Sequence, residues 1–310
     1  MNKWKNLKPK KQTVGDLIKQ MKLTAFNARR LGEAAEVLED MIRDKDCFKF
    51  LGLSGALIPA GMRLCVVEMI RRGWVDLIVS TGSNITHDIA QCFGEEYLQC
   101  DPEKINDLEL RRKGLDRIYD LVSSTETMAT MEKNIQTILS EVEDGEYSTF
   151  DLVNEIGSRL KDRNSIVRNA YEKKVKIIVP ALIDSILGMQ VWMNSQTRNL
   201  KLNELKDLGY AINLNFDLKK QGKNTGALIL GGGVVKNFIL QSVLMADKPH
   251  KYVVQVTTDT PQYGGLSGAT LKEALSWGKV DEKAKLCTVY CDATIALPLI
   301  VSDLIERLGP

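Results

Sequence analysis

Short apolar runs alternate along this chain with segments in which apolar residues recur every three or four positions. Runs of four to seven residues are typical of buried strands, and the periodic segments are typical of helices that pack one face on a sheet. The predicted strands are 48–53, 75–81, 176–180, 227–230, 252–257 and 286–290, and the predicted helices are 62–72, 85–93, 183–193, 234–245 and 294–308. Repeated strand, turn and helix units predict an α/β fold with a doubly wound, mostly parallel sheet and helices on both faces.

A longer and more polar region, residues 101–175, separates the second predicted strand from the third. Helical patterns occupy 127–142 and 149–160, and the region has neither a Pro-, Gly- or Ser-rich linker nor an internal repeat. We therefore expect a helical insertion within a single domain that spans 1–310.

The N-terminal segment is rich in lysine, with Lys3, Lys5, Lys8, Lys10 and Lys11. Such a cluster is typical of a solvated, flexible arm, which we expect over residues 1–12. The pattern over 14–21 is that of a short helix.

Composition and charge exclude several classes of function. The 310 residues are 44% hydrophobic and 26% charged, and the formal net charge of +2 gives no argument for a nucleic-acid or membrane partner. No apolar stretch approaches the roughly 20 residues of a membrane helix, and no signal peptide is evident. Six cysteines without paired CxxC units, together with two histidines, predict free thiols and no metal site. We expect a cytoplasmic protein.

The segment from Glu273 to Lys279 combines a carboxylate, an indole and a lysine. A helix is predicted over 270–277, Gly278 is a natural terminator, and Lys279 lies just beyond it. Glu273 and Trp277, four residues apart, share one helix face and suit a cationic ligand. A lysine that loses its proton in an apolar pocket attacks carbonyl or imine carbons. The alternative is that Lys279 only caps helix carbonyls.

Three strand ends run through small residues into predicted helices: 51–61, 80–88 and 231–236. Such turns let a phosphate or a planar ring approach the amides at a helix N-terminus. Tight turns also require glycine for steric reasons alone, and the GxGxxG fingerprint is missing. The three turns together favour a nucleotide.

Two acids and two histidines stand near predicted strand ends. Asp184 and Asp292 each follow a strand, where they are candidates for ribose hydroxyls or for helix N-caps. His87 lies at the expected sheet rim and is a candidate for binding or a hydrogen-bonded bystander. His250 is predicted to lie in a surface turn.

Five segments together resemble the deoxyhypusine synthase family, over about residues 13–307. They are Phe50–Arg63, Ile229–Lys236, Gly265–Ala269, Glu273–Lys279 and Tyr290–Ala293. The resemblance implies a Rossmann-like fold and a homotetramer with NAD and polyamine sites shared across a dimer interface. It also implies that NAD oxidises spermidine, that a butylimine moves to the active-site lysine, and that an acceptor amine takes it before reduction.

The resemblance assigns roles to individual residues. Lys279 matches the imine-forming lysine, and Glu273 and Trp277 match residues that line the polyamine site. Asn237 and His87 stand at further substrate positions. The positions that match NAD contacts are Gly55, Ala56, Thr81, Gly82, Asp184, Gly232, Thr258, Asp292 and Ala293.

Several positions depart from the family pattern. Asn237 and Phe238 replace a histidine pair, and an asparagine is no base near neutral pH. Family acidic positions hold Met189, Leu266, Thr86 and His87. Since an unpaired buried ammonium is costly, these changes indicate that the amine pocket binds its ligand through contacts different from those usual in the family.

Three functions remain open on this basis. The first is transfer of the aminobutyl group of spermidine to a lysine of the hypusine-bearing translation factor. The second is homospermidine synthase-like transfer to a small amine, and the third is an inactive subunit that binds NAD.

Overall fold

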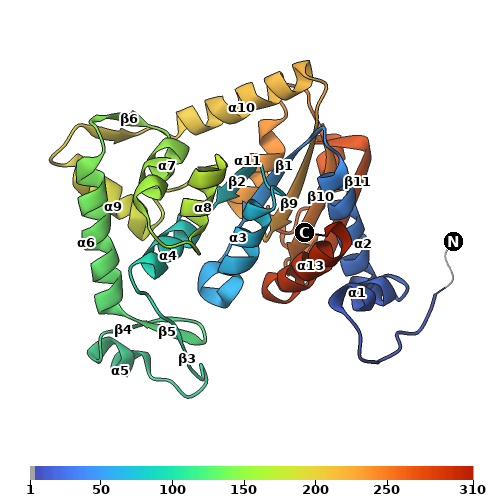
Figure 1. Cartoon of the computed structure of the whole chain (residues 1–310), viewed down its shortest axis with the longest axis horizontal. Coiled ribbons are helices and arrows are strands. Elements are labelled where there is room, and N and C mark those ends of the chain that lie inside the picture. Colours follow the sequence, from blue (N-terminus) through green and yellow to red (C-terminus); the bar gives the residue numbers. More distant parts are fainter. Residues whose placement is uncertain (1–3, 310) are drawn as a thin grey trace. The chain divides into compact units, whose positions relative to one another are not determined.

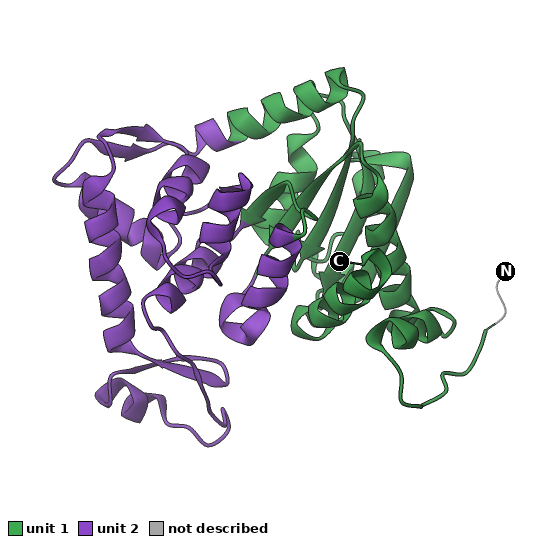
Figure 2. Cartoon of the chain, viewed as in Figure 1, with its two compact units in different colours: residues 1–54, 72–79, 208–310 green, residues 55–71, 80–207 purple. Residues whose placement is uncertain are grey.

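The apolar runs form the strands of a mostly parallel sheet flanked by helices, as predicted. The computed structural model describes residues 4–309 and contains two compact units, which Figure 2 shows in different colours. Unit 1 comprises residues 1–54, 72–79 and 208–310, and unit 2 comprises 55–71 and 80–207. This division by contacts does not test the single-domain prediction, which stays a prediction.

Unit 1 contains five strands in the order β11–β10–β9–β1–β2. Their bounds are β1 (Cys47–Leu53), β2 (Leu77–Ser80), β9 (Asn224–Leu230), β10 (His250–Thr257) and β11 (Val280–Tyr290). β1 pairs with β9, β9 with β10, and β10 with β11, each in parallel. Because helices cover both faces of the sheet, its inner strands β1, β9 and β10 are largely apolar, and Leu51, Leu228 and Val254 are accordingly buried. The edge strand β11 begins earlier than the predicted 286–290, and its first half is charged and partly exposed.

The helices of unit 1 cover both faces of this sheet. They are α1 (Val14–Lys22), α2 (Phe26–Arg43), α11 (Gly233–Ser242), α12 (Glu273–Ser276), α13 (Ala293–Leu308) and most of α10 (Leu205–Lys220), with the short η2 (Pro261–Tyr263). A Cβ on Gly52 of β1 would meet Val235 and Ile239 of α11, whereas a Cβ on Gly226 of β9 would meet Met41 of α2. Gly52 pairs with Ile229 of β9 and faces the same side of the sheet as that residue. Gly226 lies three positions before Ile229, and because successive residues of a strand alternate between faces, the two glycines face opposite sides. Figure 1 shows α2 and α13 together beside β10 and β11.

The N-terminal segment has specific contacts. The N–H of Lys5 donates to the carbonyl of Leu23 at 3.0 Å. The predicted helix over 14–21 is confirmed as α1, and Glu306 of α13 accepts hydrogen bonds from Thr13 Oγ1 at 2.7 Å and Gly15 N at 3.1 Å. These bonds attach α1 to α13 within unit 1.

Unit 2 contains the predicted insertion, which is not helical throughout. The expected helices are confirmed as α6 (Thr125–Glu141) and α7 (Thr149–Arg159). A small antiparallel sheet in the order β3–β5–β4 lies at the start of α6 and is made of β3 (Leu98–Gln99), β4 (Leu115–Ile118) and β5 (Leu121–Ser124). The other elements are η1 (Ile58–Met62), α3 (Arg63–Arg71), α4 (Gly82–Cys92), α5 (Asp107–Arg112), β6 (Gly145–Tyr147), α8 (Ile166–Lys173), β7 (Lys176–Ile178), α9 (Ile186–Ser195) and β8 (Leu200–Leu202).

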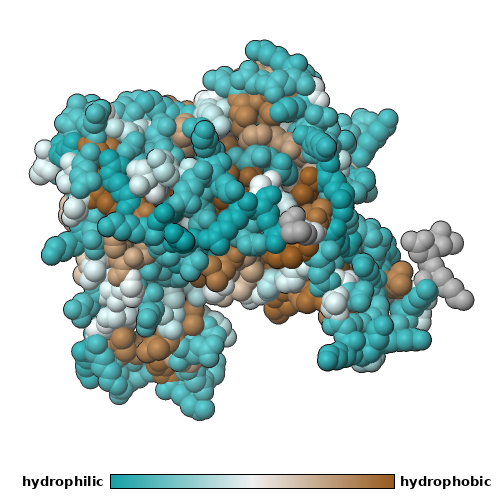
Figure 3. Space-filling view, in the orientation of Figure 1, coloured by the Kyte–Doolittle hydropathy of each residue, from teal (hydrophilic) through white to brown (hydrophobic). Residues whose placement is uncertain are grey.

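Hydrophobic side chains are exposed around this small sheet. Leu98, Leu108 and Tyr119 are mostly accessible, and the space-filling view shows hydrophobic surface over the same region at its lower left (Figure 3). Exposed apolar groups that gather in this way are typical of contact surfaces. No helix within residues 4–309 is both long enough and apolar enough to cross a bilayer.

A buried carboxylate connects three helices of unit 2. Asp88 of α4 is fully buried and accepts hydrogen bonds from Arg63 Nε of α3 at 2.6 Å and from Ser165 Oγ at 2.7 Å. It also accepts from the N–H groups of Ile166 at 2.9 Å and Val167 at 3.0 Å, at the start of α8. The charge is therefore paired and hydrogen-bonded, as a buried charge requires.

The prediction that His250 lies in a surface turn is wrong. Its side chain is 0% exposed at the start of β10, where its ring packs edge-on against Phe50 with centroids 5.5 Å apart. One ring nitrogen, Nε2, lies 3.3 Å from the carbonyl of Ile239. Burial lowers the pKa of His250 to about 4, so the imidazole is neutral at physiological pH. The turn ends at Asp247, and His250 begins β10, where Phe50 of β1 and Ile239 of α11 contact its ring.

Candidate active site

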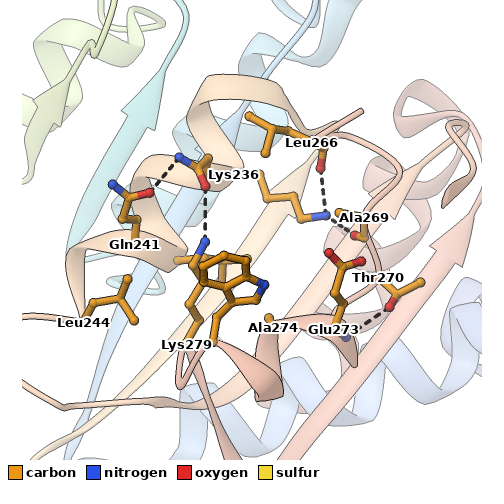
Figure 4. A pocket seen from close by; sticks show the side chains of 12 residues that line it. Lys236, Gln241, Leu244, Leu266, Ala269, Thr270, Glu273, Ala274 and Lys279 are labelled. Atoms are coloured by element: carbon orange, nitrogen blue, oxygen red, sulfur yellow. Dashed lines mark hydrogen bonds between the residues drawn. The ribbon is translucent and has the colours of Figure 1, made fainter. Parts of the chain in front are cut away.

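A cavity of about 490 Å³ in unit 1 brings together several of the predicted site residues (Figure 4). It lies between α11, the turn over 266–270, and the end of α12. Its lining residues are Lys236, Asn237, Leu240, Gln241, Leu244, Leu266, Ala269, Thr270, Glu273, Ala274, Trp277 and Lys279. Four of the five predicted catalytic and substrate residues are among them.

Backbone geometry at the end of α12 fixes the position of Lys279. The predicted helix over 270–277 is shorter than expected, because α12 covers only residues 273–276. Gly278 adopts a left-handed conformation with φ of 67°. Its N–H donates to the carbonyl of Leu275 and the N–H of Lys279 donates to that of Ala274, each at 3.0 Å. This Schellman arrangement turns the chain so that Lys279 leads directly into β11.

The amine of Lys279 contacts polar and aromatic partners in the cavity. Its Nζ donates to Asn237 Oδ1 at 3.3 Å, and Asn237 Nδ2 donates to Gln241 Oε1 at 3.1 Å. The same Nζ lies 5.6 Å from the ring centroid of Trp277. The amine therefore lies over a π face, within reach of a ligand in the cavity.

Charge in the cavity is unevenly distributed. Among its lining residues, all of which the structure describes, one carboxylate, that of Glu273, stands with two lysines. Leu240, Leu244 and Leu266 supply apolar wall, and the Trp277 side chain is 63% exposed. A cationic ligand would therefore be attracted at the Glu273 and Trp277 side, while an alkyl chain would contact the leucines.

Lys236 is a cavity residue that sequence reasoning missed as a site residue. It is 4% exposed, and its Nζ donates to the carbonyls of Leu266, at 3.1 Å, and Ala269. The pKa of Lys236 is lowered to about 8, mainly by burial; Glu273 and Asp259 oppose the shift, and Lys279 contributes to it. The signal in the sequence was its place in the Ile229–Lys236 segment. Its hydrogen bonds to carbonyls 30 and 33 residues away could not be seen from local spacing.

The cofactor candidates fall in both units. Gly232, Thr258, Asp292 and Ala293 belong to unit 1, and Gly55, Ala56, Thr81, Gly82 and Asp184 belong to unit 2. Asp292 caps α13 by accepting from Thr294 N at 2.7 Å, so the capping alternative is confirmed for this residue. For Asp184 that alternative is wrong, because Ser185 caps α9 by accepting from Gly188 N at 3.0 Å, which leaves Asp184 exposed.

Helix N-termini in each unit suit a phosphate group. Thr81 is the N-cap residue of α4 and Gly232 that of α11, and neither makes a side-chain cap bond within the described residues. Gly55 adopts a left-handed conformation with φ of 73° and is exposed. Uncapped N–H groups beside glycine suit a phosphate, so each of these helix starts, taken by itself, fits a phosphate group such as those of NAD.

His87 is a hydrogen-bonded residue of unit 2 and does not line the cavity. Its Nδ1 lies 2.8 Å from Tyr97 Oη and 3.3 Å from Glu95 Oε2. Tyr97 Oη donates to Glu95, whose side chain is fully buried. These contacts match the bystander alternative, and a substrate role for His87 stays a prediction.

Comparisons with known proteins agree with one another. The family model described as deoxyhypusine synthase matches residues 16–304. Over 298 residues the chain is 42% identical to "Probable deoxyhypusine synthase 1" of Archaeoglobus fulgidus, covering 96% of this chain and 95% of that protein. It is 40% identical over 293 residues to "Probable deoxyhypusine synthase 2" of the same organism, covering 92% of this chain and 96% of that protein. The fold is similar to the crystal structure of a putative deoxyhypusine synthase from Entamoeba histolytica, with a TM-score of 0.66, 19% identity, and coverage of 93% of this chain and 91% of that chain.

Proposed function

Because this chain belongs to the deoxyhypusine synthase family, a transferase family, we propose that it is an NAD-dependent aminobutyl transferase. The donor is spermidine, the carrier is Lys279, and the acceptor is a lysine of the hypusine-bearing translation factor. The observation that carries the proposal is the placement of the Lys279 amine in a cavity with Trp277 and Glu273.

NAD, when bound, supplies the hydride acceptor that oxidises a C–N bond of the donor and later returns the hydride to the product. The nine cofactor candidates named above are proposed to contact it. The uncapped starts of α4 and α11 support this assignment, since each presents N–H groups.

Lys279 is proposed to act as the nucleophile. Its neutral amine attacks the carbon of the oxidised donor, the C–N bond to 1,3-diaminopropane breaks, and an aminobutyl imine remains on Nζ. The acceptor amine then attacks the same carbon, and the C–N bond to Lys279 breaks. Asn237 orients Lys279 because its amide oxygen accepts a hydrogen bond from Nζ. An amide oxygen is not a base near neutral pH, so it does not remove the proton.

Glu273 and Trp277 are proposed to bind the free ammonium of the aminobutyl group. A carboxylate and an indole face are both complementary to a cation, and both line the cavity. The leucine wall would contact the butyl chain. The substrate role of His87, which the resemblance suggested, rests on sequence position alone.

Borohydride trapping tests the proposal. Wild type, Lys279→Arg and, as the control, Lys272→Arg are incubated with NAD and spermidine, reduced, digested and analysed by mass spectrometry. Lys272 lies on the exposed surface near α12. We expect an aminobutyl adduct on the peptide with Lys279 in wild type and in Lys272→Arg, in an NAD-dependent manner. No adduct in wild type with NAD bound would refute the proposal for spermidine.

The same assay distinguishes the alternatives. Loss of the adduct when the purified translation factor is added would support the proposed acceptor. Loss with putrescine alone would indicate homospermidine synthase-like transfer, and NAD binding without adduct or NADH would indicate an inactive subunit. Neither alternative has a structural observation of its own in the part of the chain that the structure describes.

We also infer a cytoplasmic homotetramer. Support comes from apolar side chains left exposed in and before α9, namely Ile183, Met189, Trp192 and Met193. Side chains of this kind are usually buried at contacts between subunits. Light scattering coupled to gel filtration measures the assembly, and a monomer at micromolar concentration would contradict it.

A further inference from the structure

We propose that Lys236 is a positioning residue that fixes residues 265–269 as one wall of the Lys279 cavity. The inference concerns the cavity of the proposed function, but its first test uses neither substrate nor cofactor.

Three carbonyls of the 265–269 segment accept hydrogen bonds from side chains of the sheet and of α11. Lys236 Nζ donates to the carbonyls of Leu266, at 3.1 Å, and Ala269. Between them, the carbonyl of Ser267 accepts from Gln255 Nε2 at 2.9 Å. The same Gln255 nitrogen donates to the carbonyl of Gly231 at 2.9 Å. Two buried side chains therefore hold this turn against the strand ends.

Close packing limits the segment at two glycines. A Cβ on Gly232 would lie 2.4 Å from Cα of Ser267, and a Cβ on Gly268 would lie 2.0 Å from the carbonyl oxygen of Thr260. At Gly265, by contrast, the nearest atom to an added Cβ is Asp259 Oδ2 at 3.8 Å. The middle of the turn is thus fitted to its neighbours, whereas its start is open.

The charge of Lys236 suits this role better than it suits ligand binding. Its ammonium is buried, it is directed to two carbonyl oxygens, and charge-assisted bonds of this kind are stronger than neutral ones. The charged groups that face it are Glu273, Asp259 and Lys279. Glu273 lines the cavity with Leu266 and Ala269, so the segment that Lys236 holds lies next to the proposed ammonium site (Figure 4).

Loss of the two hydrogen bonds from Lys236 would change the cavity wall. Leu266 and Ala269 both line the cavity. When an apolar residue replaces Lys236, the carbonyl of each loses its hydrogen-bond donor. We expect the turn to open locally, because two of its three carbonyl bonds to side chains are lost, only that from Gln255 to Ser267 remains, and the segment belongs to no strand.

Hydrogen–deuterium exchange on the full chain tests the proposal. The variants are Lys236→Met, Lys236→Arg as the conservative replacement, and Lys272→Met as an exposed control. In Lys236→Met we expect exchange in 264–269 to rise by about tenfold or more, with β1 and β9 unchanged. In Lys236→Arg and Lys272→Met we expect protection close to that of wild type. Unchanged exchange in 264–269, or an equal rise in β1 and β9, would overturn the proposal.

A second pair of variants probes the same wall without touching Lys236. Gly268→Ala should increase exchange in 264–269, because its Cβ has no room, and Gly265→Ala should leave it near wild type. Equal effects of the two substitutions would contradict a fitted turn. If the protein proves active on an amine, Lys236→Met should raise KM for that amine more than it lowers kcat. If it proves inactive, the exchange experiment still decides the role of Lys236.

Discussion

Protonation of His250 is predicted to destabilise this protein at acidic pH. The ring is fully buried, its Nδ1 has no hydrogen-bond partner within the described residues, and burial lowers its pKa from 6.5 to about 4. Below pH 6.5 the unfolded chain binds a proton at this residue, whereas the folded chain stays neutral until about pH 4. Folding stability is therefore lost as the pH falls through this window. The pKa difference corresponds to about 3 kcal/mol of unfolding free energy at pH 4.

Two measurements check the prediction. In NMR titrations the ring resonance of His250, assigned by comparison with His87→Gln, should not move between pH 7 and pH 5. In urea unfolding, stability should fall more steeply with acidification in wild type than in His250→Gln. The comparison with the variant removes the contribution of carboxylates that titrate in the same range. A difference between the two proteins that stays constant within about 0.5 kcal/mol from pH 7 to pH 4 would refute the reasoning.

Three further predictions concern single side chains. Asp88→Ala should lower the urea-derived unfolding free energy by about 3–5 kcal/mol, because Arg63 loses its fully buried partner and keeps only the partly exposed Asp162, while the donors at the start of α8 lose their acceptor; a loss below about 1 kcal/mol, the size expected for a surface ion pair, would contradict this. Gly209→Ala in α10 should stabilise by about 0.5–1 kcal/mol, since an added Cβ would meet no atom within 4 Å, and a lowered Tm would contradict it. Trp277→Ala should raise KM for the amine about threefold to thirtyfold, and an unchanged KM would argue against a cation–π contact.

The buried sheet could be predicted from sequence because its inner strands contain short apolar runs, whereas β11 was predicted only over its more apolar half, 286–290. β9 and β10 are nearly continuous in buried residues, and such runs are distinctive. The small sheet of β3, β4 and β5 was not predicted, since its residues are largely exposed and do not alternate clearly. The long helices α2 and α10 were missed as well. In α2 the buried apolar residues recur at helical spacing, so the sequence held a signal that was overlooked, whereas α10 buries only two apolar residues, Ala211 and Leu218.

The candidate site shows the same limit. Lys279, Trp277 and Glu273 are close in sequence, and Gly278 marks the turn that joins them, so local reasoning placed them together correctly. Lys236 makes its contacts 30 and 33 residues away, and His250 is buried against Phe50, which is distant in sequence, and near the carbonyl of Ile239. Local spacing does not indicate such contacts. For this reason Lys236 was interpreted only as part of a glycine-rich turn, and His250 as part of a surface turn.

The backbone at Lys279 has a consequence for how a carrier residue would move. Its N–H donates to the carbonyl of Ala274 at 3.0 Å, and its carbonyl accepts from the N–H of His250 at 3.1 Å. Both backbone polar groups are thus bonded, one to α12 and the other to β10. Any displacement of Nζ between a donor and an acceptor must come from rotation about the side-chain bonds alone. The distance over which this residue can carry a group is therefore set by the length of the lysine side chain, and not by loop motion.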